Sequence, residues 1–408
     1  MKEKYVFHID VNNAFLSWTA VYLLEHGYKK DIRKVPSVIG GDPKTRSGIV
    51  LAKSPIAKKY GIVTAETLYS ARKKCKDLEV YPPDYKWYYK KSRELMDYLK
   101  QYSPIQEQFS VDECFLDMSG MKYIYDDLIK LAYHIKDEVK EKFGYTVNIG
   151  IGNNKLCAKM ASDFEKPDKV HTLLKDEIAT KLWPLDVGDL FMCGKRTKQE
   201  LNKLNIYTIK DLAHKDKKYL EKHFKTQGTY LYNACRGIDT SLVEETHSKN
   251  QSISVTETMP HDYSDRDELK EIIFRQTEEV TRELRSKELF VKTVGVIFKN
   301  SNFISYSAQT TLNKPTDNTK EILKKIYEVF DNNYKDDEIR LIGVRLANLT
   351  KNKTEQISIF DTEDNEKQDN IQKTIDSINN KFGKSLIKPA SLELISGRKS
   401  KKSYMEKK

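Results

Sequence analysis

Three acidic residues in two distant segments are of the type that phosphoryl-transfer chemistry requires. Asp10 ends an apolar run, and Asp112 and Glu113 are adjacent in a much later segment. Enzymes of this kind often use two divalent cations about 4 Å apart, held by carboxylates. An Asp-Glu pair in a turn is most often simply solvated, whereas an Asp that ends a buried strand is costly to leave unpaired. The acids alone therefore leave both a two-metal site and a solvated turn open.

The elements that must position these acids alternate between strands and helices. The apolar run over 5–10 predicts a buried strand, and residues 102–118 predict a β-hairpin with the Asp-Glu pair near its bend. The alternation predicts an α/β first region. The other elements expected there are a helix over 13–26, two short strands within 34–51, a basic helix over 54–60, a long amphipathic helix over 123–143, a strand over 145–151 and a helix over 154–164.

The second half of the sequence changes character twice. Residues 183–237 have a helical pattern without a convincing strand, and a polar stretch over 244–250 separates them from the last patterned region. That region, residues 252–348, repeats a strand–helix–strand pattern. The order βαββαβ predicts a small α+β sheet domain, so the chain as a whole is expected to be α/β and α+β multidomain.

The composition limits the class of protein. A length of 408 residues suggests about two to four domains, and 38% hydrophobic content excludes a wholly disordered chain. The net charge of +11 fits a polyanionic partner, although basic solvated faces are common. The cysteines include no C-x-x-C pair, so buried reduced thiols are expected rather than a disulfide framework or a zinc site. No apolar stretch is long enough to span a membrane, and we expect a cytoplasmic location.

Three motifs resemble those of Y-family (translesion) DNA polymerases, in the family's order. Residues 7–15 (FHIDVNNAF) resemble the first catalytic motif, 110–117 (SVDECFLD) the second and 150–159 (GIGNNKLCAK) the third. The resemblance continues to about residue 350 and is nearest to the bacterial DNA polymerase IV-like branch. It implies a right-hand architecture: a palm over 1–26 and 76–170, fingers over 27–75, a thumb with a helix-hairpin-helix over 171–240, a linker over 241–250, a little finger over 251–350 and a tail over 351–408.

The resemblance also implies roles for individual residues. Asp10, Asp112 and Glu113 match the ligands of two Mg²⁺ ions, and the backbone carbonyl of Val11 would complete one of them. Phe15 matches the steric gate, an aromatic ring in the space that a ribose 2′-hydroxyl would need. The further nucleotide-binding residues are Asn13, Ala14, Lys58 and Lys155. Many family members have Arg at the position of Lys58, and Lys contacts phosphate as a point charge without the two-pronged geometry of Arg.

Two further regions of the resemblance concern macromolecular partners. Gly194, Lys195 and Arg196 resemble the thumb hairpin that holds duplex phosphates, while Lys292 and Lys299 would add charge in the little finger. The pentapeptide Gln356, Ile357, Ser358, Ile359 and Phe360 resembles the segment that binds the bacterial sliding clamp (its β subunit). The same five residues are also compatible with an ordinary strand.

These features together predict a low-fidelity, DNA-templated DNA polymerase that acts in translesion synthesis and DNA repair. A primer 3′-hydroxyl would attack the α-phosphorus of a dNTP, and pyrophosphate would leave. Proofreading is not expected, because no separate carboxylate-rich nuclease module is evident. The alternatives are a two-metal nuclease and a catalytically silent DNA- and clamp-binding protein. The expected partners are primer-template DNA, a dNTP and the clamp, and we expect a nucleoid-associated monomer.

Overall fold

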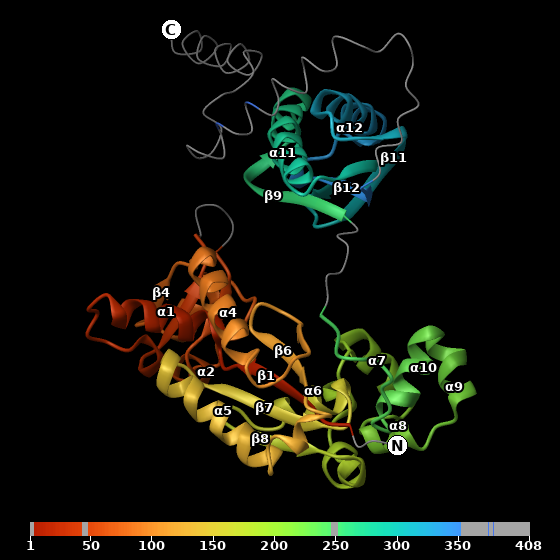
Figure 1. Ribbon diagram of the computed structural model, residues 1–408. Coiled ribbons are helices and arrows are strands. Elements are labelled where there is room, and N and C mark those ends of the chain that lie inside the picture. Colours follow the sequence, from red (N-terminus) through yellow and green to blue (C-terminus); the bar gives the residue numbers. More distant parts are fainter. Residues whose placement is uncertain (1–3, 43–47, 246–251, 352–373, 375–377, 379–408) are drawn as a thin grey trace. The chain divides into compact units, whose positions relative to one another are not determined.

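The computed structural model describes residues 4–42, 48–245 and 252–351, together with Thr374 and Ile378. The chain divides near residue 247 into two compact units, each with its own sheet and core (Figure 1). The expected clamp-binding segment 356–360 lies outside the described residues. None of the described helices is long and apolar enough to span a membrane.

A five-stranded sheet forms the centre of the first unit, and β1 (Val6–Val11) is its middle strand. The sheet order is β5-β6-β1-β7-β8, and β1 runs antiparallel to both of its neighbours. The strands expected over 5–10 and 145–151 and the hairpin expected over 102–118 are confirmed with slightly shifted bounds. The remaining strands are β5 (Gln106–Gln108), β6 (Glu113–Asp117), β7 (Val147–Gly152) and β8 (Val170–Leu173).

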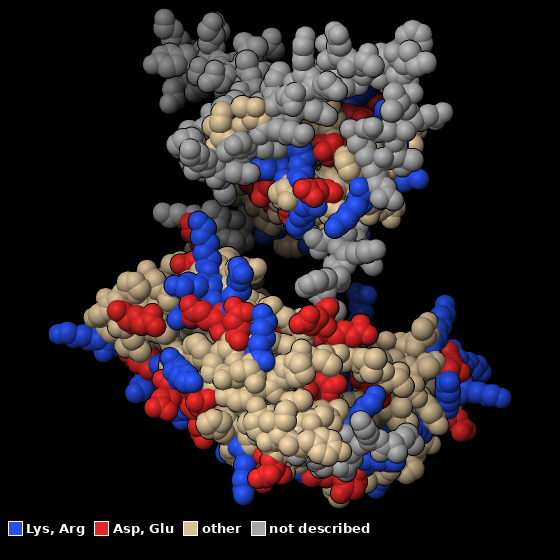
Figure 2. Space-filling view, in the orientation of Figure 1, with Lys and Arg blue, Asp and Glu red and all other residues tan. Residues whose placement is uncertain are grey.

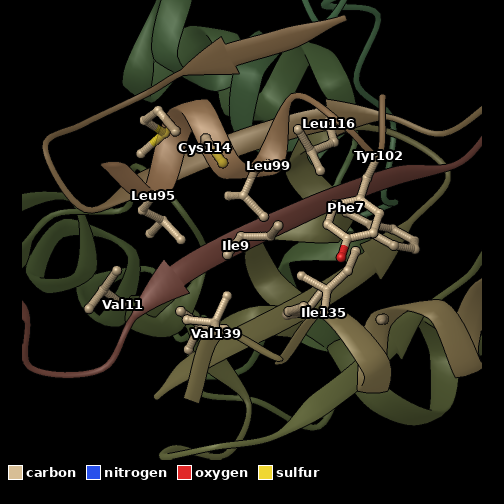
Figure 3. Packing of buried hydrophobic residues seen from close by; sticks show 14 of the residues in the cluster. Phe7, Ile9, Val11, Leu95, Leu99, Tyr102, Cys114, Leu116, Ile135 and Val139 are labelled. Atoms are coloured by element: carbon tan, nitrogen blue, oxygen red, sulfur yellow. The ribbon is translucent and has the colours of Figure 1, made fainter. Parts of the chain in front are cut away.

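The side chains of β1 alternate between a core face and a polar face. Phe7, Ile9 and Val11 are at most 1% exposed and pack in the largest core of the first unit (Figure 3). The alternate residues, His8 and Asp10, therefore project from the opposite face of the sheet. Because apolar and polar residues alternate along β1, the Asp10 carboxylate lies on the face of the sheet opposite the main core.

Two long helices supply the other side of this core. Leu95 and Leu99 come from α4 (Tyr85–Leu99), while Ile135 and Val139 come from α5 (Leu128–Phe143) (Figure 3). The helix expected over 123–143 therefore begins five residues late. The reason is a local cap, because the Asp127 carboxylate accepts hydrogen bonds from the N–H groups of Ile129 and Lys130. Our sequence prediction did not include α4.

Two further helices of the first unit match their predicted positions within one residue. These are α1 (Ala14–Glu25), expected over 13–26, and α6 (Lys155–Asp163), expected over 154–164. Asn154 caps α6, because its side chain accepts a hydrogen bond from the Cys157 N–H at 2.8 Å.

A three-stranded sheet of order β3-β2-β4 forms the region expected to be the fingers. β4 pairs parallel with β2, so this sheet includes residues up to Tyr81, beyond the predicted bound of the fingers at residue 75. Similarly, β8 pairs parallel with β7, so the five-stranded sheet includes residues beyond the predicted palm bound at residue 170. Both strands are too short to carry a periodic sequence signal. The domain bounds themselves stay predictions. The elements of this region are β2 (Ser37–Gly40), β3 (Val50–Lys53), α2 (Pro55–Lys59), α3 (Leu68–Lys74) and β4 (Glu79–Tyr81).

Residues 183–237 are helical without a strand, as predicted, and pack together with the apolar face of α6 in a second core of the first unit. Leu201, Leu212, Leu220 and Leu231 are fully buried in it. The helices are α7 (Lys195–Lys203), α8 (Ile209–Ala213), α9 (Lys217–Phe224) and α10 (Thr226–Ala234).

The second unit has the predicted βαββαβ order. Its four-stranded sheet has the order β11-β10-β12-β9, and one face packs against both helices. Residues Gln309, Gly295, Arg345 and Ser254 lie opposite one another across the four strands, and Gln309, Arg345 and Ser254 are exposed on the other face. The elements are β9 (Ser252–Tyr263), α11 (Arg266–Ser286), β10 (Phe290–Asn300), β11 (Ser305–Thr316), α12 (Thr319–Asn333) and β12 (Ile339–Thr350).

Candidate active site

Asp10 and Glu113 lie directly opposite each other at one end of the central strand. The antiparallel register of β1 and β6 pairs these two residues, and the Val11 N–H donates to the Asp112 carbonyl oxygen at 3.0 Å. Directly opposed residues project from the same face of a sheet, with Cβ atoms about 5 Å apart. The fold therefore brings the three predicted acids together.

Asp112 lies at the bend that precedes β6, and a local turn holds it there. The Ser110 hydroxyl donates to the Asp112 carboxylate at 2.6 Å and accepts from the Asp112 N–H at 3.2 Å. Ser and Asp form such local hydrogen bonds readily in turns. The bend thus fixes the backbone of Asp112 beside the end of β1.

Two lysine ammonium groups lie between these carboxylates. Lys159 on α6 donates to Glu113 Oε1 at 2.5 Å and lies 3.5 Å from Asp10 Oδ2. Lys166, in the loop after α6, donates to the same Asp10 oxygen at 2.7 Å. Asp163 joins both lysines, at 3.2 Å from Lys159 and 2.9 Å from Lys166. Asp10, Lys159, Asp163 and Lys166 therefore form a closed ring of alternating charges, and Glu113 joins this ring through Lys159.

Burial and the neighbouring charges together shift the pKa values of Asp10, Lys159 and His8. It raises the pKa of Asp10 above its usual range, although the charges of Lys166 and Lys159 oppose the shift. Burial lowers the pKa of Lys159, but the hydrogen bond to Glu113 and the charge of Asp10 outweigh it, so the net pKa is raised. The pKa of His8 falls well below its usual range because of burial and the two nearby lysines. At neutral pH, His8 is therefore neutral and Lys159 is charged.

Two glycines of β7 let α6 approach the polar face of the sheet. A Cβ atom at Gly150 would lie 2.0 Å from the Ala158 carbonyl oxygen, and one at Gly152 would lie 2.4 Å from the Ala158 nitrogen. Only residues without a Cβ fit at such distances. Because Lys159 follows Ala158 directly, this close packing sets the position of its ammonium group at the carboxylates.

Lys155, the lysine selected from the third motif, has a different neighbour. Its ammonium group donates to both carboxylate oxygens of Glu107 on β5, at 2.6 and 2.7 Å. Glu107 Oε2 also accepts from the Glu244 N–H at 3.2 Å. The structure therefore pairs Lys155 with Glu107, and its predicted phosphate contact stays a prediction. Sequence reasoning missed Lys159 and Lys166, although Lys159 lies one helical turn after Lys155 on the same predicted face.

The predicted gate residue Phe15 is half-buried in the first turn of α1. Its ring stacks on Tyr88 with centroids 4.7 Å apart and an angle of 11° between the rings, and the edge of Tyr85 approaches it at 6.1 Å. Tyr88 is itself held by a 2.8 Å hydrogen bond to the Thr19 hydroxyl. Stacked aromatic rings restrict each other, so the Phe15 ring has a defined position on Tyr88.

Two of the other predicted nucleotide-binding residues, Asn13 and Ala14, lie at the start of α1. Asn13 precedes the helix in a left-handed conformation (φ 53°), and its side chain donates to the Lys53 carbonyl on β3 at 2.7 Å. Ala14 begins the helix, whose N-terminus is a favourable place for anions. Lys58 is exposed on α2.

The donor set fits divalent cations. Asp10 and Glu113 share one cation, the Lys159 ammonium group, and carboxylate oxygens are ligands that Mg²⁺ prefers. Within the described residues, no three acidic, His or Cys side chains converge on one point as they stand. As they stand, Glu113 Oε1 and Asp10 Oδ2 are instead in contact with the ammonium groups of Lys159 and Lys166.

The predicted DNA-binding residues are exposed. Gly194, Lys195 and Arg196 lie at the start of α7, while on β10 Lys292 is exposed and Lys299 is partly exposed. Basic side chains also gather at the end of the first unit that carries α9 and α10 (Figure 2). These include Lys217, Lys218, Lys222 and Lys225.

Family models match most of the chain. The impB/mucB/samB family matches residues 9–163, its C-terminal domain matches residues 250–359, and a model described as the DNA polymerase-iota thumb domain matches residues 189–239. These matches include all three acids and the helical region of the first unit.

Curated relatives match almost the full length. The chain is 42% identical over 388 residues to DNA polymerase IV of Clostridium acetobutylicum, covering 94% of this chain and 97% of the relative. It is 31% identical over 401 residues to DNA polymerase IV 2 of Bacillus subtilis, covering 96% and 95%.

A solved structure confirms the predicted right-hand fold. The Y-family DNA polymerase chimera Dbh-Dpo4(243-245)-Dbh matches with a TM-score of 0.73 at 22% identity, and the match covers 85% of this chain and all of the chimera. The chain therefore belongs to the Y-family DNA polymerases of the impB/mucB/samB type.

Proposed function

We infer that this chain is a DNA-directed DNA polymerase that copies damaged templates, transferring a nucleotide from a dNTP to a primer 3′-hydroxyl without proofreading. The observation that carries the assignment of the centre is the register that sets Asp10 against Glu113, with Asp112 beside them. Attack on the α-phosphorus releases pyrophosphate, and catalysis of this kind consists mainly of positioning and charge stabilisation.

A divalent metal is a requirement of this family, and we propose two Mg²⁺ ions per site. Asp10, Asp112, Glu113 and the Val11 carbonyl would hold them. Such ions activate the attacking hydroxyl and stabilise charge on the phosphates. When Asp10 and Glu113 bind metal, the Lys159 and Lys166 ammonium groups would keep Asp163 as a shared partner and would be available to neutralise the triphosphate. Their 2.5 and 2.7 Å contacts with the acids support this role more directly than the position of Lys155 or Lys58 does.

Nucleotide selection is assigned to Phe15. The ring, fixed in the first turn of α1 by its stacking on Tyr88, supports a role as a barrier to a ribose 2′-hydroxyl. The backbone N–H groups of Asn13 and Ala14, at the start of α1, are proposed to meet the triphosphate.

Primer-template DNA is proposed to contact both units. In the first unit, Gly194, Lys195 and Arg196 would hold phosphates at the N-terminus of α7. In the second, the polar face of the sheet is exposed, and Lys292 and Lys299 on β10 add charge. Contacts of this kind bind the phosphate backbone of the DNA and do not depend on its base sequence, as expected for a polymerase that accepts any template.

The sequence of residues 356–360 supports a proposed contact with the bacterial sliding clamp. Such a short motif folds on binding and seats its apolar side chains in a pocket. We also propose that the chain acts as a monomer in the cytoplasm, near the nucleoid.

A primer-extension assay with Mg²⁺ and dNTPs tests the proposal. Extension is expected from the unmodified chain; shortening of the primer would support a two-metal nuclease, and neither change would support a silent binding protein. Asp112→Ala should abolish extension while primer-template affinity stays within about threefold, because a metal ligand acts in the chemical step. Asp97→Ala, at an exposed acid on α4, is the matched control. Equal loss of binding and extension in Asp112→Ala would contradict the metal role.

A further inference from the structure

Buried amide side chains hold the loop that carries Lys166. Asn148 on β7 is fully buried, and its Nδ2 donates to the carbonyl oxygens of Ser162 at 3.0 Å and Glu165 at 2.6 Å. Its Oδ1 accepts from the Lys169 N–H at 3.3 Å. One side chain thus binds the backbone on both sides of Lys166.

Asn12, which follows β1, completes this arrangement. Its Nδ2 donates to Asn148 Oδ1 at 3.0 Å, and its Oδ1 accepts from the Asp168 N–H at 2.9 Å and the Thr146 hydroxyl at 2.9 Å. Asn12 is 8% exposed. The two amides therefore link the central strands to the backbone of the loop before and after Lys166.

Asp168 fixes the far side of the loop. Its carboxylate accepts from Lys136 and Lys140 on α5, each at 2.8 Å, and the Lys136 side chain is only 9% exposed. Asp168 also has a left-handed backbone (φ 63°), which costs energy in a residue other than glycine. Several hydrogen bonds and ion pairs therefore stabilise a backbone conformation that is unfavourable for the loop by itself.

We propose that Asn12, Asn148 and Asp168 are positioning residues that hold the Lys166 ammonium group at Asp10 and, once metal occupies the acids, at the phosphates of the incoming dNTP. This inference rests on the proposed polymerase function. Lysine has a long flexible stem, so the direction of its charge depends on the backbone from which it starts. Misplacement by about 1 Å of a group that contacts substrate can reduce a rate by about 100-fold.

The test is a double-mutant cycle on dNTP affinity, measured with the full chain and primer-template. Asn148→Ala and Lys166→Ala are each expected to weaken dNTP binding about tenfold, and the double variant about as much as Lys166→Ala alone. Affinity is read from the dNTP dependence of single-nucleotide insertion and, separately, from fluorescence titration with a labelled dNTP in Ca²⁺. Gln276→Ala, at another buried amide in the second unit, is the control for general destabilisation.

Asp168→Asn supplies a second variant in case Asn148→Ala does not fold, because it keeps the shape of the side chain and weakens both ion pairs. Hydrogen exchange at residues 164–170 should be faster in either variant but not in Gln276→Ala. The proposal is overturned if the effects of the loop variants and of Lys166→Ala on dNTP affinity are independent and additive. It is also overturned if hydrogen exchange at residues 164–170 becomes faster while dNTP affinity stays unchanged. Failure of the unmodified chain to extend a primer would instead overturn the proposed function.

Discussion

Replacement of Gly150 by alanine tests whether the close approach of α6 to β7 builds the catalytic centre. The added Cβ atom would lie 2.0 Å from the Ala158 carbonyl oxygen, 2.4 Å from the Ser162 nitrogen and 3.0 Å from the Ser162 Cα atom. All three are backbone atoms, so no rotation of a side chain relieves the clash. Ordinary contact begins at 3.4 Å, and α6 must move away from the sheet to reach it.

The structure sets the size of the expected effect. The contact must lengthen from 2.0 Å to about 3.4 Å, and Lys159 on the same helix now lies 2.5 Å from Glu113. Overpacking of this kind costs about 1–3 kcal/mol of folding free energy. A shift of more than about 1 Å in a group beside the reacting phosphates is expected to slow insertion by about 100-fold. The loss of rate should therefore exceed what the fall in stability explains.

The measurements are urea unfolding and single-nucleotide insertion under single-turnover conditions, at a temperature where the variant is folded. Gly120→Ala is the matched control, because no atom lies within 4 Å of its Cβ position and its φ of −105° suits any residue. The reasoning is refuted if Gly150→Ala matches Gly120→Ala in both stability and insertion rate. Lower stability with an unchanged rate would show that α6 does not position the centre.

Three further outcomes are expected. Phe15→Ala should raise ribonucleotide insertion relative to deoxyribonucleotide insertion by roughly 10–100-fold, because the stacked ring no longer fills the space that a ribose 2′-hydroxyl needs. Tyr123→Ala, at a residue that is 89% exposed, is the control. Unchanged discrimination between the two kinds of nucleotide in Phe15→Ala argues against the gate. Deletion of residues 356–360 should leave unassisted synthesis intact and remove stimulation by the clamp, whereas the control deletion of residues 401–405 should leave both intact. If stimulation survives the deletion of 356–360, these residues are not the clamp-binding motif. Removal of divalent metal with EDTA should stop primer extension and should change the melting temperature of the protein by no more than about 2 °C. A larger fall in the melting temperature would show that metal supports the fold.

The sequence predicted the elements that carry the acids because local signals mark them: an apolar run ends at Asp10, and a hairpin carries Asp112 and Glu113. That these two segments lie side by side did not follow from the local pattern and was implied only by the family resemblance. The βαββαβ order of the second unit was likewise visible, because its helices carry amphipathic stripes more than three turns long.

The lysines could not be selected in the same way. Lys155 and Lys159 lie four residues apart on one helix, and only the tertiary fold decides that the first meets Glu107 and the second meets Glu113. Lys166 lies in a loop, where neither period nor propensity indicates direction. The late start of α5 and the short strands β4 and β8 were missed for a similar reason, because one cap or three residues of pairing leave little trace in a periodic pattern.

The ring of lysines and acids has a consequence for how this protein matures. Zinc fingers and similar small domains assemble only around their ion, because nothing in the polypeptide offsets the repulsion among the ligands. Here Lys159 and Lys166 act as built-in counter-ions for Asp10 and Glu113. We therefore expect a newly synthesised chain to reach its native conformation without a divalent metal, and we expect the metal to be needed only for the activity of the folded enzyme.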